Sequence, residues 1–332
     1  MARDVRVAVV GAGGAAQVVH LPILKRLPEL DVAAVVDPHE EKAWTIGERF
    51  GVGEVREEVA GLDDLDVDAA VVCTPNDTHE EVVLACLDLG LHVLCERPLS
   101  ISSSSVERMI AAAEEADRQL MVAMNQRFRY DTRSIRQFVR SGELGEVFFL
   151  RSSLLNQRER RPRKGWRRDP DRAGGGVMMD LGVQAVDLAL WIQGFPRVER
   201  VSARFHRRRE VEDSATALLS LEGGSTVSVE VTWELMEERD RQSLYVFGTR
   251  GSASTAPFRV QKEMETGLTD VTPPLDVDPG GLYTASYRQE WAAFLRRVRG
   301  ERELEPEREQ IHLMEAVEAC YRSAEEGREV EV

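Results

Sequence analysis

The sequence predicts an α/β protein of two domains: residues 1–124 form a doubly wound parallel sheet, and residues 125–332 form an α+β domain with an open, mostly antiparallel sheet. The first observation is length, because 332 residues, 42% of them hydrophobic, exceed what one compact core usually serves. The second is an alternation of short apolar runs with helix-like segments of about 10–15 residues in the first part of the chain. The third is a change of pattern after about Asn125, where strand-like segments mostly follow one another directly.

The strands predicted in the first domain are short, apolar and rich in β-branched residues. Val5–Val10 is typical, since it is almost entirely apolar, as expected for a central parallel strand that helices cover on both faces. Gly51 and Gly90 end helices, and Pro75 ends a strand. The predicted strands are Val5–Val10, Val32–Val36, Ala69–Cys73, His92–Cys95 and Leu120–Met124, and the predicted helices are Ala15–Leu27, His39–Phe50, Thr78–Leu89 and Ser102–Ala116.

The second domain is predicted to have fewer helices. A turn at Glu222-Gly223-Gly224 joins two strand-like segments as an antiparallel hairpin. One face of an open sheet must be covered, and we expect helices around Val177–Trp191 and Tyr287–Val298 to cover it, with the other face in a subunit interface. The predicted strands are Val147–Leu154, Arg200–His206, Thr216–Leu221, Ser225–Thr232 and Ser243–Gly248.

A glycine turn follows the first strand and opens the first helix, in the pattern G-x-G-x-x-A. Gly11 permits the tight turn, Gly13 lets the backbone approach a pyrophosphate, and Ala16 keeps the helix close to the sheet. The helix N-terminus adds free N–H groups and a partial positive charge for phosphates. The whole turn, Gly11-Ala12-Gly13-Gly14-Ala15-Ala16, is therefore predicted to hold the pyrophosphate of NAD or NADP in a Rossmann dinucleotide-binding domain.

Asp37 stands at the end of the second predicted strand, about 20 residues after the glycine turn. A carboxylate at this place can accept a hydrogen bond from the ribose 2′-hydroxyl and would repel the 2′-phosphate of NADP. We therefore expect the cofactor to be NAD rather than NADP.

The charge balance restricts the partners. With 43 basic and 58 acidic residues, the net charge of −15 would repel nucleic-acid phosphates and anionic lipid headgroups. No uninterrupted apolar run has membrane-spanning length, and the N-terminus lacks the pattern of a signal peptide. We therefore expect a small-molecule substrate, no nucleic-acid or membrane partner, and a cytoplasmic location.

The cysteines and histidines give no sign of a metal site. None of the four cysteines belongs to a C-x-x-C pair, and we expect buried free thiols, as in a reducing cytoplasm. The six histidines are scattered without zinc-binding spacing, so no metal is expected. The cysteines are Cys73, Cys86, Cys95 and Cys320.

Seven motifs follow one another along the chain. They are Gly11–Ala16 with His20-Leu21-Pro22, Cys73-Thr74-Pro75-Asn76 with His79, Glu96-Arg97-Pro98, Asn125-Gln126-Arg127-Phe128, Ala173-Gly174-Gly175-Gly176, Asp180-Leu181-Gly182 with Asp187, and Glu212-Asp213. In this order they resemble the glucose-fructose oxidoreductase, inositol dehydrogenase and rhizopine-catabolism (Gfo/Idh/MocA) family over nearly the whole chain.

The resemblance implies NAD(P) in the Rossmann domain, a sugar, polyol or related substrate against the sheet of the second domain, and a homodimer or homotetramer. It places Thr74, Pro75, Asn76 and His79 beside the nicotinamide ribose. Gly174, Gly175 and Asp180 would border the substrate. The predicted cofactor-binding residues are Gly11, Gly13, Gly14, Ala15, Ala16, Asp37, Thr74, Pro75, Asn76, His79, Glu96, Arg97 and Asn125.

Two positions depart from the family pattern, and both concern catalysis. The family usually has Glu-Lys-Pro, with the lysine near the reacting carbon, and this chain has Arg97 in place of that lysine. The family also usually has Asp-x-Gly-x-His, with the histidine as proton carrier, and this chain has Gln184 in place of that histidine. Glutamine has no titratable proton, and arginine stays protonated at physiological pH. Arg97 can orient a substrate and stabilise an alkoxide, but it cannot transfer a proton.

Three hypotheses remain open at this point. In the first, another titratable residue moves the proton, the candidates being Lys164, Asp180, Tyr283 and Tyr287. In the second, the substrate is an acid or an activated compound that Arg97 binds through a bidentate pair, and no protein base is needed. In the third, the chain binds the cofactor as a sensor or regulatory protein without turnover. We favour an NAD(P)-dependent dehydrogenase or reductase acting on CH–OH groups.

Overall fold

The chain divides into two compact units, each described by itself below. The computed structural model describes residues 4–158, 165–265, 267–275 and 281–332. The first unit comprises Met1–Ser100, Ser104–Ala123 and Tyr287–Arg308, and the second comprises Ile101–Ser103, Met124–Ser286 and Glu309–Val332. The main division lies where the sequence pattern changes, but the structure differs from a single cut after residue 124, because Tyr287–Arg308 returns to the first unit.

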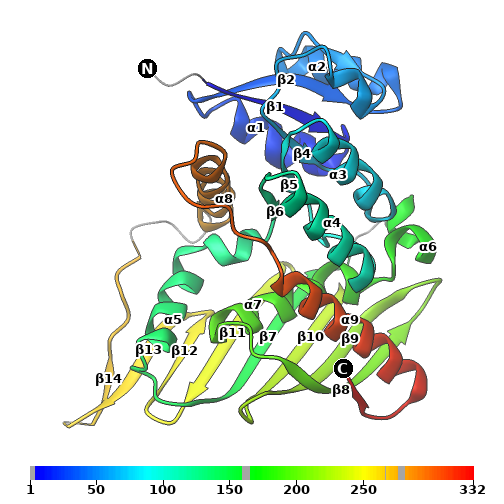
Figure 1. Cartoon of the computed structure of the whole chain (residues 1–332). Coiled ribbons are helices and arrows are strands. Elements are labelled where there is room, and N and C mark those ends of the chain that lie inside the picture. The colour runs from blue at the N-terminus through cyan, green and yellow to red at the C-terminus, as the bar shows by residue number, and fades with distance from the viewer. Residues whose placement is uncertain (1–3, 159–164, 266, 276–280) are drawn as a thin grey trace. The chain divides into compact units, whose positions relative to one another are not determined.

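A six-stranded parallel sheet forms the first unit, in the order β3-β2-β1-β4-β5-β6 (Figure 1). The strand order reverses between β1 and β4, and open α/β sheets bind ligands at the carboxyl ends of their strands beside such a reversal. The predicted Rossmann fold is confirmed. The strands are β1 (Val5–Val10), β2 (Leu30–Val36), β3 (Val55–Arg56), β4 (Ala69–Val72), β5 (His92–Cys95) and β6 (Leu120–Val122), and the main helices are α2 (Glu40–Phe50), α3 (His79–Asp88) and α4 (Ser103–Glu115).

The helix after the glycine turn is less regular than the sequence predicts. Ala16–His20 is a π-helical turn, η1, and only α1 (Leu21–Leu24) is α-helical. Pro22 lies in the first turn of α1 and has no N–H to donate to the carbonyl four residues earlier, which accounts for the break in the α-helical hydrogen bonding.

Nine strands make up the sheet of the second unit, in the order β14-β13-β12-β11-β7-β10-β9-β8-β15. Among the described strands of this sheet only β7 and β10 pair in parallel, so the predicted open and mostly antiparallel sheet is confirmed. The unpredicted strands, β12 to β15, are short or polar and lack an apolar run. The strands are β7 (Val147–Gln157), β8 (Val198–Arg207), β9 (Glu212–Leu221), β10 (Thr226–Leu235), β11 (Arg241–Gly248), β12 (Gly251–Thr255), β13 (Phe258–Met264), β14 (Gly267–Asp270) and β15 (Val330–Glu331).

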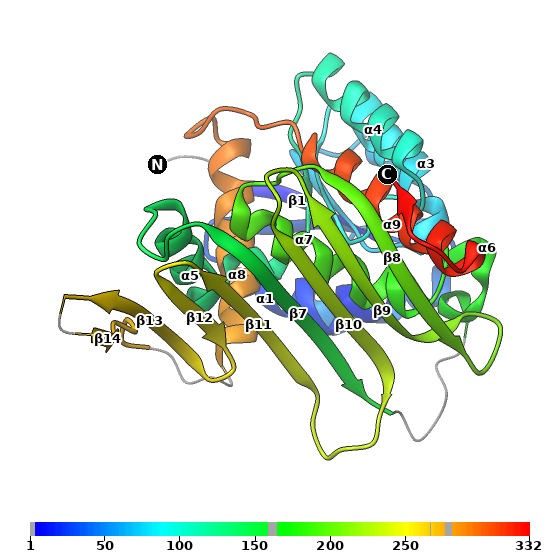
Figure 2. The same ribbon diagram turned by 90° about the horizontal axis from the view of Figure 1, so that it is seen from below.

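Three helices cover one face of this sheet: α5 (Tyr130–Arg140), α7 (Val183–Gln193) and α9 (Glu309–Glu326) (Figures 1 and 2). In the described parts of the chain, no helix lies on the opposite face (Figure 2). The expectation for Val177–Trp191 is met by α7. The expectation for Tyr287–Val298 is wrong, because most of α8 (Leu282–Val298) packs in the first unit.

The helical segment Pro170–Gln193 is long and apolar enough to cross a membrane, although Asp180 and Asp187 interrupt its apolar run. In the structure, 89% of its most apolar window is buried inside the protein. This burial is the pattern of a core helix in a folded domain.

A buried ion pair connects three elements of the second unit. Arg127, in the turn η4 (Asn125–Phe128), donates to both carboxylate oxygens of Asp187 on α7, at 2.9 and 2.5 Å, and to Glu309 on α9 at 3.1 Å. The side chains of Arg127 and Asp187 are only 10% and 1% exposed.

We predict that Arg127→Met lowers the free energy of unfolding by about 3–5 kcal/mol, because it leaves the Asp187 carboxylate buried without its partner. The double variant Arg127→Met/Asp187→Leu should recover most of this loss. Arg151→Met, which breaks the exposed Arg151–Glu230 pair, is the matched control and should cost less than about 1 kcal/mol. Denaturant unfolding measures all three, and equal losses in the two single variants would contradict the account.

Candidate functional site

Except for Asn125, which belongs to the second unit, the predicted cofactor residues follow the carboxyl ends of four neighbouring strands: β2, β1, β4 and β5. Gly11 leaves β1 with a φ of +94° and donates its N–H to the Val36 carbonyl at 2.7 Å. A Cβ at Gly11 would lie 2.8 Å from the Cys73 carbonyl carbon and 2.9 Å from the Thr74 nitrogen. Because both the positive φ and the contact with backbone exclude a side chain, only glycine fits here.

The rest of the turn is tied to Asp37 and leaves space for a ligand. The Ala12 N–H donates to Asp37 Oδ2 at 2.9 Å, which joins the turn to the end of β2. A Cβ at Gly14 would meet nothing within 4 Å. The backbone at Gly14 is therefore open on the side where the sequence predicts a pyrophosphate.

Asp37 is a buried carboxylate that accepts hydrogen bonds from several donors. Besides Ala12, it accepts from the His39 N–H at 3.1 Å and from Lys42 Nζ at 2.5 Å. Burial acts to raise the pKa of Asp37, but the hydrogen bonds from Lys42, His39 and Ala12 outweigh it and lower the pKa below its usual value. Asp37 is therefore ionised at neutral pH, as acceptance from a ribose hydroxyl requires.

The loop after β4 contains an unsatisfied hydroxyl and a fixed histidine. Thr74 Oγ1 is buried and has no hydrogen-bond partner among the described residues. His79 is 1% exposed, with Nδ1 2.9 Å from the Pro98 carbonyl and Nε2 3.0 Å from the Thr74 carbonyl. Burial lowers the pKa of His79, although these carbonyls oppose the shift. His79 thus holds together the loops that follow β4 and β5, and Thr74 is left to bind a ligand.

Glu96 is oriented by a chain of two hydrogen bonds that begins on α8. Trp291 Nε1 donates to His20 Nδ1 at 3.1 Å, and His20 Nε2 lies 2.9 Å from Glu96 Oε1. An indole N–H can only donate, so His20 Nδ1 must be the acceptor and Nε2 must carry the proton that goes to Glu96. Burial acts to raise the pKa of Glu96, but the hydrogen bond from His20 and the charge of Arg97 lower it. The result is an ionised Glu96 that accepts the Nε2–H of His20.

These features fit a dinucleotide. Gly11 lets the turn pack closely against the end of β4, and the Gly14 backbone is open. Among the described residues the Thr74 hydroxyl has no partner, and Asp37 is an ionised acceptor. Glycine backbone N–H groups at a helix start bind phosphates, and a carboxylate at the next strand end binds ribose.

In the second unit, Glu212 holds the glycine loop in place. Glu212 Oε1 accepts from the Gly176 N–H at 2.8 Å, the Met178 N–H at 3.1 Å and the Tyr321 hydroxyl at 2.7 Å. Burial, together with the charge of Glu212, raises the pKa of Tyr321 well above its usual range, so the phenol remains a donor. A Cβ at Gly175 would lie 1.9 Å from the Tyr321 oxygen, which explains the glycine.

Asp180 and Gln184 lie together after this loop. Asp180 belongs to the π-helical turn η6 (Met178–Gly182), and its Oδ2 accepts from Trp233 Nε1 at 3.0 Å. The Gln184 amide donates to the Asp180 backbone carbonyl at 3.1 Å, and Gln184 is buried. Asp187 lies on the same helical face, but its carboxylate forms the ion pair with Arg127. Of these two aspartates, Asp180 is therefore the one outside the Arg127 ion pair.

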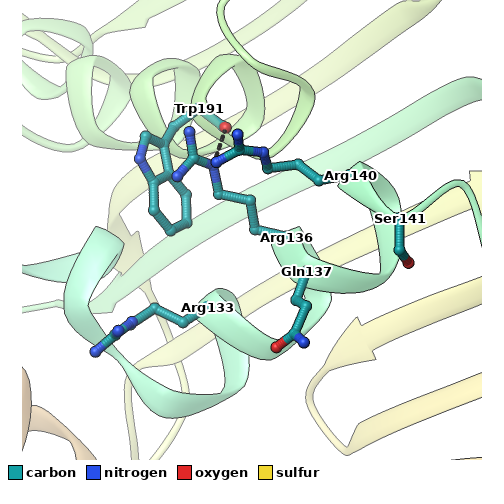
Figure 3. A pocket seen from close by; sticks show the side chains of 6 residues that line it. All are labelled: Arg133, Arg136, Gln137, Arg140, Ser141 and Trp191. Carbon is teal, nitrogen blue, oxygen red and sulfur yellow. Dashed lines mark hydrogen bonds between the residues drawn. The ribbon is translucent and has the colours of Figure 1, made fainter.

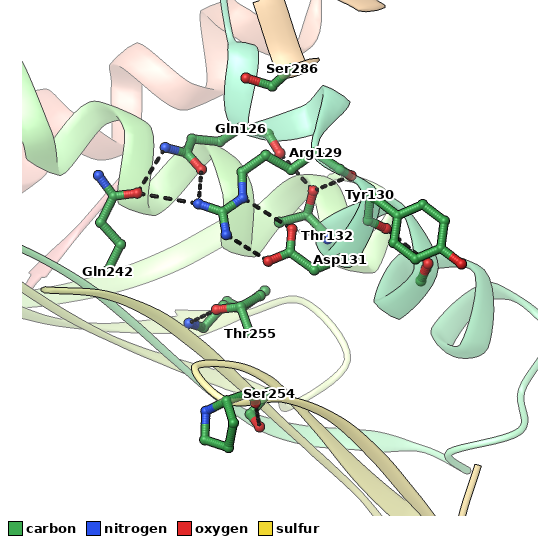
Figure 4. Close-up of polar contacts among 12 residues, drawn as sticks. Gln126, Arg129, Tyr130, Asp131, Thr132, Gln242, Ser254, Thr255 and Ser286 are labelled. Carbon is green, nitrogen blue, oxygen red and sulfur yellow. Dashed lines mark hydrogen bonds and ion pairs between the residues drawn. The ribbon is translucent and has the colours of Figure 1, made fainter. Parts of the chain in front are cut away.

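Asn125 is fixed by neighbours in its own unit. Its side-chain amide donates to Ser286 Oγ at 3.1 Å. The adjacent Gln126 belongs to a polar network in which Arg129 donates to Asp131 at 3.0 and 2.6 Å and approaches the Gln126 carbonyl oxygen at 3.4 Å (Figure 4). These contacts set the backbone that carries Asn125.

The other residues proposed to move the proton differ in their position and exposure. Lys164 lies outside the described residues. Tyr283, on α8, is 51% exposed, whereas Tyr287 is 6% exposed and packs edge-on against His20 in the first unit. Arg97 follows β5 and is half-buried, with its N–H 3.3 Å from Glu96 Oε2. Sequence reasoning missed Lys42, Trp233, Trp291 and Tyr321, since no motif marks them.

Comparison with known proteins identifies the family. Residues 5–124 match the model described as "Oxidoreductase family, NAD-binding Rossmann fold", and residues 132–254 match the "GFO/IDH/MocA C-terminal domain". The chain belongs to the GFO/IDH/MocA oxidoreductase family. This confirms the resemblance and makes the protein an NAD(P)-dependent oxidoreductase.

Several family members are similar over most of their length. D-glucoside 3-dehydrogenase of Escherichia coli is 26% identical over 98% of this chain and 97% of its own. D-xylose 1-dehydrogenase (NADP(+)) 2 of Haloferax volcanii is 33% identical over 92% of this chain and 93% of its own. The crystal structure of GenD2 from gentamicin A biosynthesis, in complex with NAD, is 26% identical with a TM-score of 0.86, and the match covers 100% of this chain and 97% of GenD2.

We predict that Gly11→Ala lowers the melting temperature of the protein and abolishes NADH binding, because the new Cβ forces the turn away from Cys73. Gly14→Ala is the matched control, since its Cβ has space, and its melting temperature should stay at the wild-type value. Thermal unfolding followed by circular dichroism compares the two. Equal melting temperatures for both variants would show that the close approach is unimportant.

A second prediction concerns the tautomer of His20. Nitrogen NMR at pH 7 should show a neutral ring protonated at Nε2, because Nδ1 accepts from Trp291. Trp291→Phe removes the donor, and the spectrum of His20 should then change. An imidazolium signal for His20 in the wild-type protein would contradict the assigned hydrogen-bond chain.

Proposed function

We propose that this enzyme is an NAD-dependent dehydrogenase that oxidises a hydroxyl-bearing carbon of a sugar or polyol. The observation that carries the proposal is the ionised Asp37 bonded to the glycine turn of a Rossmann unit. The sugar substrate class is supported by the names of relatives, which include dehydrogenases of D-glucosides and D-xylose.

The first unit would hold the cofactor through residues already described. The turn Gly11–Ala16 offers its N–H groups to the pyrophosphate, Asp37 accepts from the adenosine ribose, and Thr74 donates its free hydroxyl. When bound, NAD accepts a hydride from the carbon that carries the substrate hydroxyl.

Removal of the hydroxyl proton is assigned to Asp180. Arg97 and Gln184 cannot accept a proton, so the family's usual lysine and histidine chemistry is not available. Asp180 is half-buried and its carboxylate is oriented by Trp233. Gln184, in the same unit, would donate to or accept from substrate hydroxyls.

The preference for NAD over NADP is also part of the proposal. The buried Asp37 carboxylate would repel a 2′-phosphate, while Lys42 neutralises part of that charge. The Haloferax volcanii relative carries NADP in its name, so the preference has to be measured for this chain.

Two further parts of the proposal are the assembly and the compartment. Three aromatic rings stack on the sheet: the ring centroid of Phe247 lies 5.5 Å from that of Phe149 and 6.4 Å from that of Tyr245. Their positions alternate along β7 and β11 with the buried Leu150, Leu244 and Val246. We infer that a second copy of the chain covers this face of the sheet in a homodimer or homotetramer.

The four cysteines are free thiols, which supports a reducing cytoplasm.

A turnover screen tests the function. Polyols, sugars and sugar acids are offered with NAD⁺ and NADP⁺, and nicotinamide absorbance is followed. We expect saturable turnover with at least one neutral sugar or polyol, and a loss of about 10²–10⁴-fold in kcat for Asp180→Asn with NADH binding retained. Turnover that appears only in the variant Arg97→Lys/Gln184→His would mean that the natural chain lacks its catalyst and would overturn the proposal in favour of a regulatory protein.

We predict that Asp37→Ala shifts the ratio of kcat/KM for NAD⁺ over NADP⁺ toward NADP⁺ by about 10-fold or more, because a charge-assisted hydrogen bond is lost and a repulsion is removed. Lys42→Gln is the paired variant and should shift the ratio toward NAD⁺, since the carboxylate then loses its counterion. If the ratio is the same in wild type and Asp37→Ala, Asp37 does not select the cofactor.

A further inference from the structure

Three arginines of α5 line a pocket in the second unit. Arg133, Arg136 and Arg140 recur at helical spacing and so share one side of the helix. With Gln137, Ser141 and Trp191 they line an open pocket of about 350 Å³ (Figure 3). This volume lies at the lower end of the range of about 300–1,000 Å³ that is usual for small-molecule sites.

Within the described residues, none of the three pocket arginines forms an ion pair with a carboxylate, although the charge of Glu309 acts on Arg136 from a greater distance. Neighbouring arginines of the same unit are paired, Arg127 with Asp187 and Arg129 with Asp131. Within the part of the chain that the structure describes, neither Arg133 nor Arg140 forms an ion pair. This cluster of cations contrasts with the net charge of −15 of the whole protein.

Arg136 is the fixed member of the cluster. Its Nε donates to the Trp191 carbonyl at 3.0 Å, and its guanidinium lies 4.2 Å from the centroid of the Trp191 ring. Figure 3 shows the guanidinium groups of Arg136 and Arg140 close together beside Trp191. Burial lowers the pKa of Arg136, and the charges of Arg140 and Arg127 lower it further, while the charge of Glu309 partly opposes them. A bound anion would relieve this repulsion between like charges.

We propose that this pocket binds a small phosphate ester of about the size of a hexose phosphate. Guanidinium groups bind phosphate oxygens in bidentate pairs, and two exposed arginines beside a fixed third suit a dianion better than a single carboxylate. The volume exceeds what the phosphate alone requires, so the organic part of the ester lies against Trp191, Gln137 and Ser141. The glycine turn of the cofactor site belongs to the other unit, so this inference does not depend on the proposed function.

Titration calorimetry of the full chain at low ionic strength tests the proposal with three probes: glucose 6-phosphate, inorganic phosphate and glucose. We expect saturable binding of glucose 6-phosphate, weaker binding of inorganic phosphate, and none of glucose. The double variant Arg133→Gln/Arg140→Gln should weaken binding of glucose 6-phosphate by about 10-fold or more. The double variant Arg207→Gln/Arg209→Gln removes the same charge from exposed positions outside the pocket and should leave the affinity unchanged.

Several results would overturn the proposal. Absence of glucose 6-phosphate binding would do so, and binding of inorganic phosphate alone would reduce the site to a free-anion site. Equal losses in the two double variants would indicate general charge attraction, and an unchanged affinity in Arg133→Gln/Arg140→Gln would place the ligand elsewhere, for instance at the glycine turn. Thermal unfolding checks that the variants fold, and Arg140→Gln alone replaces the double variant if it does not.

Discussion

The close approach of Gly11 to the end of β4 is the constraint on which the nucleotide site depends. A Cβ at Gly11 would lie 2.8 Å from the Cys73 carbonyl carbon. The chain can therefore turn here after β1 only because residue 11 is glycine. The approach keeps the turn flat against the sheet, so that the Ala12 N–H reaches Asp37 at 2.9 Å. The phosphate-binding backbone and the ribose-binding carboxylate are thereby fixed relative to each other before any ligand arrives.

Carboxylates that accept hydrogen bonds recur as anchors of the functional loops. Asp37 fixes the glycine turn, Glu96 is itself fixed by His20 and Trp291, and Glu212 fixes the second glycine loop with help from Tyr321. Each of these groups would be costly to bury alone, and each is satisfied by specific donors. The acidic composition of the chain therefore includes carboxylates that build the site as well as those that solvate the surface.

The sequence predicted the Rossmann unit well because its signals are local. Buried parallel strands are continuous apolar runs, and a glycine turn between strand and helix has a fixed spacing. The irregular helix after the turn was missed, since the effect of Pro22 depends on hydrogen bonds that residue patterns show poorly. α8 was assigned to the wrong unit because its apolar face indicates burial without indicating the partner. Trp291 meets His20 across 271 positions of sequence, and no pattern in a single chain reports such a contact.

The central claim is that the first unit is a dinucleotide site built by the Gly11 turn and Asp37. Titration calorimetry of the full chain with NADH, NAD⁺ and NADPH tests it most directly. The account predicts saturable, equimolar binding of NADH and NAD⁺, with NADPH weaker. Absence of saturable binding for all three nucleotides would contradict it.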